Sequence, residues 1–101
     1  MNNITLLLLG IAISAIGVMN MRGNISTVHS YNRRKVKEED IPKYGKTIGA
    51  GTLIIGLSLV VSFFIKTYAK ESLVSFVMIP SLIIGLGIIL YGQFKYNKGI
   101  F

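Results

Sequence analysis

Three long stretches of the chain contain no Asp, Glu, Lys, Arg or His, and this pattern restricts the possible folds more than any other feature. They cover residues 1–21, 47–65 and 72–94 and are 21, 19 and 23 residues long. A helix rises about 1.5 Å per residue, so each stretch is long enough to cross a hydrocarbon core of roughly 30 Å. Because lipid offers the backbone no hydrogen-bonding partners, internally bonded helices are the favoured spanning elements.

The apolar runs favour helices over the strands of a membrane barrel. Such strands alternate polar and apolar residues, whereas residues 6–9 and 53–55 are continuously apolar. We predict an all-α integral membrane protein whose single transmembrane domain covers residues 1–101. The three helices are expected near 4–21, 46–65 and 73–93, with a basic cytoplasmic loop over 22–45. No Lys or Arg precedes the first helix, so we expect it to be retained rather than cleaved as a signal peptide.

Composition supports this class and excludes several kinds of site. Charged residues make up 15 % of the chain, against roughly 25 % in ordinary soluble domains. The chain has no cysteine and one histidine, which excludes a disulfide framework, thiol catalysis and the common structural zinc sites. We therefore expect no metal and no cofactor.

The distribution of basic residues predicts an orientation. Seven of the eleven Lys and Arg residues lie in the first connecting segment: Arg22, Arg33, Arg34, Lys35, Lys37, Lys43 and Lys46. With this segment and the C-terminus in the cytoplasm, nine basic residues lie inside and two outside, as the positive-inside rule requires. We predict that the N-terminus is outside and the C-terminus cytoplasmic. Four tyrosines near the expected span ends fit interfacial positions: Tyr44, Tyr68, Tyr91 and Tyr96.

The first connecting segment also carries possible helix caps. Ser26 or Thr27 could start a short helix. Asp40 could cap the second of the three long helices, which would then begin at about Ile41, with Pro42 in its first turn, and enter the membrane near Lys46. His29 and the acidic triplet at 38–40 are residue types that bind divalent metals. Their spacing fits no ligand pattern, so we expect a solvated charge cluster.

The basic run of this segment consists of Arg33, Arg34, Lys35 and Lys37, and it has two interpretations. It could attach to anionic lipid headgroups, at about 1 kcal/mol per basic residue near the surface. It could instead be a topology determinant and interface anchor without a ligand, which is the interpretation we favour. We expect no nucleic-acid partner, because no recognisable binding motif accompanies the charge.

The spans themselves contain no ionisable side chain. Ionisable residues at membrane depth mark proton relays, ion paths and acid–base catalysis, so their absence argues against a proton-coupled transporter and an intramembrane enzyme. We expect no enzymatic activity and assign no catalytic residue.

Small residues recur at helical spacing in all three spans. These are Gly10, Ser14 and Gly17 in the first, Gly45, Gly49 and Gly56 in the second, and Ser81 and Gly85, continuing to Gly92, in the third. Small residues let helix backbones approach closely, which drives helix association in lipid. They could pack this chain's own helices together, or one stripe could remain for a partner; both interpretations stay open.

The residues Tyr31-Asn32, the acidic triplet at 38–40 and the Lys-Tyr-Gly-Lys motif at 43–46 carry a resemblance to a known group. The chain resembles uncharacterised small three-helix membrane proteins of Gram-positive bacteria, which have a similar length and a Lys/Glu-rich loop after the first helix. The group carries no established activity. The resemblance therefore implies a bacterial plasma membrane location and little else.

Two functions follow as expectations. The first is an accessory, regulatory or immunity-type subunit of a membrane complex, acting through helix–helix contacts in the lipid bilayer with a membrane-protein partner or as a homo-oligomer. The alternative is a self-assembling pore of holin or small-channel type, in which several copies line a path with Ser14, Ser58, Ser62 and Ser81. A similarity between residues 52–59 and 81–88 leaves open whether the second and third helices are a duplicated pair.

Overall fold

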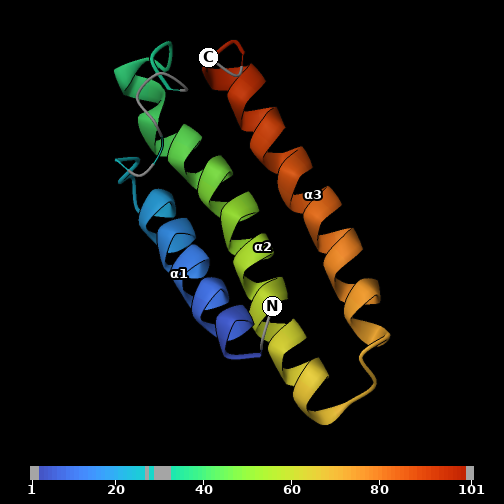
Figure 1. The fold of residues 1–101 in the computed structure, drawn as a ribbon. Helices are drawn as coiled ribbons and strands as arrows, with labels where there is room; N and C mark the ends of the chain where they lie inside the picture. Colours follow the sequence, from blue (N-terminus) through green and yellow to red (C-terminus); the bar gives the residue numbers. More distant parts are fainter. Residues whose placement is uncertain (1–2, 27, 29–32, 100–101) are drawn as a thin grey trace.

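The fold consists of three long helices, with a long connection between the first two and a short one between the last two (Figure 1). The structure, a computed structural model, describes residues 3–26, 28 and 33–99. Its helices are α1 (Asn3–Met21), α2 (Ile41–Tyr68) and α3 (Leu73–Tyr96), and the short 3₁₀ helix η2 (Glu38–Asp40) precedes α2. Each of the three long helices is long and apolar enough to cross a membrane. The all-helical fold with three candidate spans is therefore confirmed.

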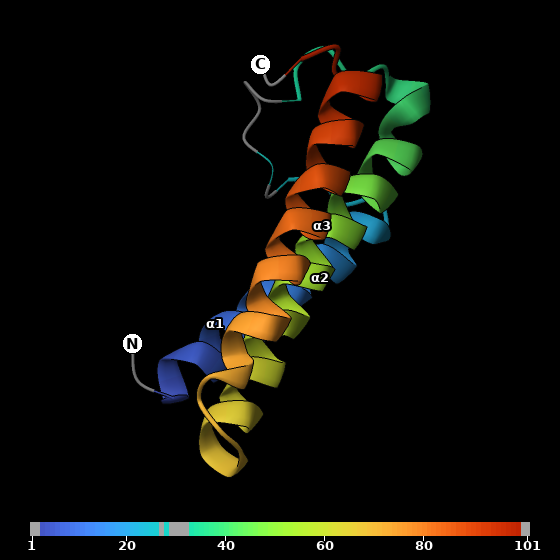
Figure 2. The ribbon, with the colours of Figure 1, turned by 90° about the vertical axis from the view of Figure 1, so that its right-hand side faces the viewer.

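The central helix of the fold is α2. It packs against α1 on one side and α3 on the other, and the three helices run antiparallel to their neighbours (Figures 1 and 2). The molecule is elongated, with extents of 45 × 20 × 18 Å. The start of α2, the loop before it, the end of α3 and residues 97–99 gather at one end (Figure 1), which we call the basic end.

Both α2 and α3 run beyond the uncharged stretches of the sequence. α2 begins at Ile41, as expected, and its 28 residues span about 42 Å. It therefore includes Lys43, Lys46 and Lys66, while α3 includes Lys95. Lysines are tolerated at helix ends because their flexible stems carry the charge towards water. The uncharged stretches thus mark the apolar part of each helix rather than its full length.

Two predicted helix caps are wrong. Asp40 occupies the position before α2, but its backbone is helical, with φ −93° and ψ −7°, and its side chain makes no capping bond. The chain enters α2 directly from η2, and the Ile41 N–H donates to the Glu38 carbonyl oxygen. No extended residue therefore separates η2 from α2 to serve as its cap. No helix begins at Ser26, whose hydroxyl and backbone N–H both donate to Asn24 Oδ1. Thr27, His29 and the Tyr31-Asn32 pair lie outside the described residues.

Candidate functional site

The contact between α1 and α2 is built on backbone-to-backbone approach at glycines. A Cβ added to Gly17 would lie 2.7 Å from the Leu53 backbone nitrogen and 2.9 Å from the Gly49 carbonyl oxygen. A Cβ on Gly10 would lie 2.8 Å from the Val60 nitrogen. No side chain fits at these distances, so α1 places its small-residue stripe against α2.

The predicted small residues of α2 face the same contact. A Cβ on Gly49 would clash with the Gly17 carbonyl oxygen, and one on Gly56 would clash with Ser14 Oγ. Gly45 lies against the Asn20 carbonyl oxygen at the basic end. The small residues of α1 and those of α2 therefore pack against each other along the length of α1.

The contact between α2 and α3 uses a second set of glycines. A Cβ on Gly85 would lie 2.9 Å from the Gly51 carbonyl oxygen, and one on Gly51 would lie 2.6 Å from the Gly85 carbonyl oxygen. Gly92 lies against Thr47, with 2.9 Å from its added Cβ to Thr47 Cγ2. Ser81 is half-buried on α3. Gly51 was not among the predicted residues, although it forms the centre of this contact.

One helical glycine points away from these contacts. An added Cβ on Gly87 of α3 would meet nothing within 4 Å. The same outward side of α3 carries large exposed apolar residues at intervals of three or four positions: Phe76, Ile79, Ile83, Leu86, Leu90 and Phe94. We call these six residues and Gly87 the α3 outer face.

Three of the four serines proposed to line a pore are turned inward, and Ser81 is half-buried. Ser58 Oγ donates to the Ile55 carbonyl oxygen at 2.6 Å and Ser62 Oγ to the Ser58 carbonyl oxygen at 2.7 Å, and both side chains are buried. Ser14 Oγ is buried against α2 and finds no hydrogen-bond partner among the described residues. Because the hydroxyls of Ser58 and Ser62 donate to carbonyl oxygens of their own helix, they do not face a solute path.

The basic run before α2 is partly occupied by internal bonds. Arg33 is half-buried, and its Nε donates to the Val28 carbonyl oxygen at 3.0 Å. Lys35 has an exposed side chain, but its backbone N–H donates to Asn97 Oδ1 at 2.8 Å. Arg34 and Lys37 are exposed, and Lys37 borders a shallow open depression with the two glutamates that follow it. Lys35 therefore ties this run to the end of α3, and Arg33 ties it to the preceding part of the loop.

A buried polar cluster at the basic end links the loop, α2 and α3. Tyr44 is fully buried, and its hydroxyl donates to Gln93 Oε1. Asn97, also fully buried, accepts from Lys35 and donates from Nδ2 to the Gly99 carbonyl oxygen at 2.8 Å. Tyr44, expected near a span end, therefore does not present its ring to the surroundings, because the end of α3 and the loop cover it. Gln93, an amide inside an uncharged stretch, was the sequence signal for this cluster.

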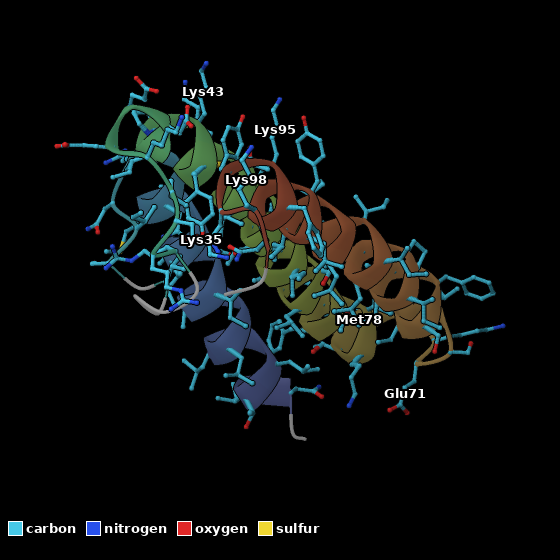
Figure 3. The ribbon with its side chains drawn as sticks, turned by 90° about the horizontal axis from the view of Figure 1, so that it is seen from above. Lys35, Lys43, Glu71, Met78, Lys95 and Lys98 are labelled. Carbon is cyan, nitrogen blue, oxygen red and sulfur yellow. The ribbon has the colours of Figure 1, made fainter. Side chains whose placement is uncertain are left out.

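Lys95 at the end of α3 is positioned by aromatic neighbours. Its Nζ donates to the Tyr91 hydroxyl at 3.0 Å and lies 5.4 Å and 5.5 Å from the ring centroids of Tyr91 and Tyr96. Ammonium groups are attracted to aromatic faces at such distances. Figure 3 shows Lys95 and Lys43 directed to the same side of the basic end.

The described residues include no group of three His, Cys, Asp or Glu side chains that could hold a metal ion. The sequence matches no protein-family model, and comparison with curated proteins and solved structures gives no match.

Proposed function

We propose that this chain is a non-enzymatic, multi-pass membrane protein that acts as an accessory, regulatory or immunity-type subunit by helix contact with another membrane protein. The observation that carries the proposal is the exposure of α3. Within the most apolar part of each helix, 6 % of the α3 residues are buried, against 22 % for α1 and 39 % for α2. α3 is therefore the helix least covered by the rest of the chain.

The α3 outer face suits a helix partner. Its residues recur at 76, 79, 83, 86, 90 and 94, a spacing close to the seven-residue repeat of left-handed helix pairs. Gly87 provides an opening between these large side chains. The glycines of α1 and α2 pack against neighbouring helices of the same chain, which supports the interpretation that small residues hold this chain's own helices together. The surface that remains for a partner is then on α3.

The pore alternative has less support. A path lined by Ser14, Ser58 and Ser62 would require their hydroxyls to face a lumen, whereas these hydroxyls face the chain's own helices. We therefore propose the accessory role alone.

We also propose a bacterial plasma membrane location with the basic end in the cytoplasm, on the charge asymmetry and the resemblance described above. Because the chain has no cysteine, single variants Lys37→Cys and Ala69→Cys report the orientation directly. In intact cells an impermeant maleimide should label Ala69→Cys and leave Lys37→Cys unlabelled. The reverse pattern would invert the proposed topology.

The partner contact is tested by photocrosslinking in living cells. A photoreactive amino acid at Ile83 or Leu90 on the α3 outer face should give a discrete adduct with another membrane protein. The same probe at Leu8 or Ile11, which are similarly exposed on α1, is the matched control and should give none.

The variant Gly87→Leu fills the opening in that face and should weaken the adduct without changing the helical content. Adducts from α1 alone, or none from either helix, would refute the proposal. An adduct of twice the chain's own mass would indicate self-association, and a liposome flux assay would then test the pore.

A further inference from the structure

We infer that the basic end holds one anionic phospholipid headgroup between α2 and α3, with Lys43, Lys95 and Tyr91 as the groups that bind its phosphate. This inference rests on the membrane location proposed above. It differs from the two interpretations drawn from the sequence, which considered headgroup attachment only at the basic run of residues 33–37 and favoured a topology determinant there.

The two helices bring the three side chains to the same part of the molecule. Tyr96 packs edge-on against Tyr44, with ring centroids 6.5 Å apart, so the last turn of α3 lies against the first turn of α2. Lys43 precedes Tyr44, Lys95 precedes Tyr96, and both lysines point to the same side of the basic end in Figure 3. The pair is therefore a feature of the packed fold, formed by residues 52 positions apart in the chain.

The donors of this site are positioned and partly free. A lysine ammonium has three N–H donors, and one of those on Lys95 is directed to the Tyr91 oxygen at 3.0 Å. The ammonium of Lys95 also interacts with Tyr96, so at least one of its donors and the hydroxyl proton of Tyr91 remain for a ligand. The exposed side chain of Lys43 supplies further donors. A phosphate, with several acceptor oxygens and negative charge, matches this set.

Charge and depth both favour a lipid as the source of the phosphate. Neither Lys43 nor Lys95 has a carboxylate within ion-pair distance among the described residues. Lys95 comes directly after the uncharged stretch of α3, and Tyr91 lies one turn earlier. This is the level at which aromatic and basic residues meet lipid headgroups.

The inference is tested with spin-labelled lipids in vesicles that contain the purified chain. The immobilised fraction of spin-labelled phosphatidylglycerol is compared with that of spin-labelled phosphatidylcholine. The wild-type chain should prefer phosphatidylglycerol, and Lys43→Gln with Lys95→Gln should lower this preference by about fivefold or more. Tyr91→Phe should lower it by a smaller factor.

The matched control removes the same charge from the same end. Lys35→Gln with Lys37→Gln should change the preference by less than about twofold, since these side chains lie outside the site. An equal loss in both double variants would show a diffuse charge effect and overturn the site. An unchanged preference in Lys43→Gln with Lys95→Gln would also overturn it.

Two further outcomes separate this inference from its alternatives. If inorganic phosphate abolishes the preference while chloride at equal ionic strength does not, the site takes a soluble phosphate and the lipid assignment is wrong. If no lipid of either kind is immobilised, the chain does not insert, which refutes the proposed function. A chain that inserts but does not distinguish the two headgroups refutes the lipid site alone.

Discussion

Replacing Gly17 by alanine should push α1 away from α2 and destabilise the fold. The added Cβ would lie 2.7 Å from the Leu53 nitrogen, 3.0 Å from Leu53 Cα and 2.9 Å from the Gly49 carbonyl oxygen, all of which are backbone atoms. Ordinary contact begins at 3.4 Å, so the two helices must separate by about 0.7 Å (3.4 − 2.7). A gap of that size forfeits roughly a quarter to a half of each neighbouring contact's dispersion energy.

The magnitude follows from a comparison with Gly87→Ala. Alanine is the better helix former by about 1 kcal/mol, and this gain is common to both variants. The Cβ at Gly87 meets nothing within 4 Å, so that variant carries no overpacking cost. Gly17→Ala should therefore be less stable than Gly87→Ala by about 1–3 kcal/mol, the usual cost of overpacking.

The assay follows the separation of α1 from α2 in mixed micelles as sodium dodecyl sulfate is added. Donor and acceptor dyes on Ile4→Cys and Tyr68→Cys report it, because both side chains are exposed and the adjacent residues Asn3 and Thr67 are hydrogen-bonded at 3.3 Å. Gly17→Ala should lose energy transfer at a lower detergent fraction than Gly87→Ala. Equal midpoints would refute the claim that backbone contact holds these helices together.

Three further predictions concern polar groups. Tyr44→Phe removes the hydroxyl that donates to the buried Gln93 oxygen, so the same titration should show a loss of about 1 kcal/mol; an unchanged midpoint would contradict the hydrogen bond. Asn97→Ala removes the acceptor of the Lys35 N–H, so that amide should exchange hydrogen faster, while an unaltered rate would place its protection elsewhere. Ser14→Ala removes a buried hydroxyl that has no partner among the described residues, so it should leave stability unchanged or raise it; a loss of more than about 0.5 kcal/mol would reveal a partner.

The three helices were predictable because charge is expensive in an apolar medium and the uncharged stretches are long. The start of α2 at Ile41 was predicted, but the far ends of α2 and α3 were less predictable, since Lys66 and Lys95 are helical although they stop the uncharged runs. A residue's charge excludes it from the apolar layer without excluding it from a helix. The failed cap at Asp40 has a related cause, because η2 leads into α2 without an extended residue.

The polar cluster at the basic end was missed for a different reason. The position of Tyr44 near a span end fits an interfacial ring, and its burial depends on where the last turn of α3 lies. That contact joins residues 49 positions apart. The amide of Gln93 inside an otherwise apolar stretch was a usable signal, because such groups usually find a partner on a neighbouring helix. The sequence did not identify that partner.

The central place of α2 follows from the angular spacing of its glycines. Successive residues of a helix are turned by about 100°, so Gly45, Gly49 and Gly56 share one face and Gly51 lies roughly 200° from Gly49. α2 therefore has small residues on two opposite faces, one against α1 and one against α3. With these faces filled, a partner of the kind proposed meets large side chains on α3. Such packing keeps helix axes about 8–10 Å apart, so its strength depends on side-chain fit around Gly87 rather than on backbone contact.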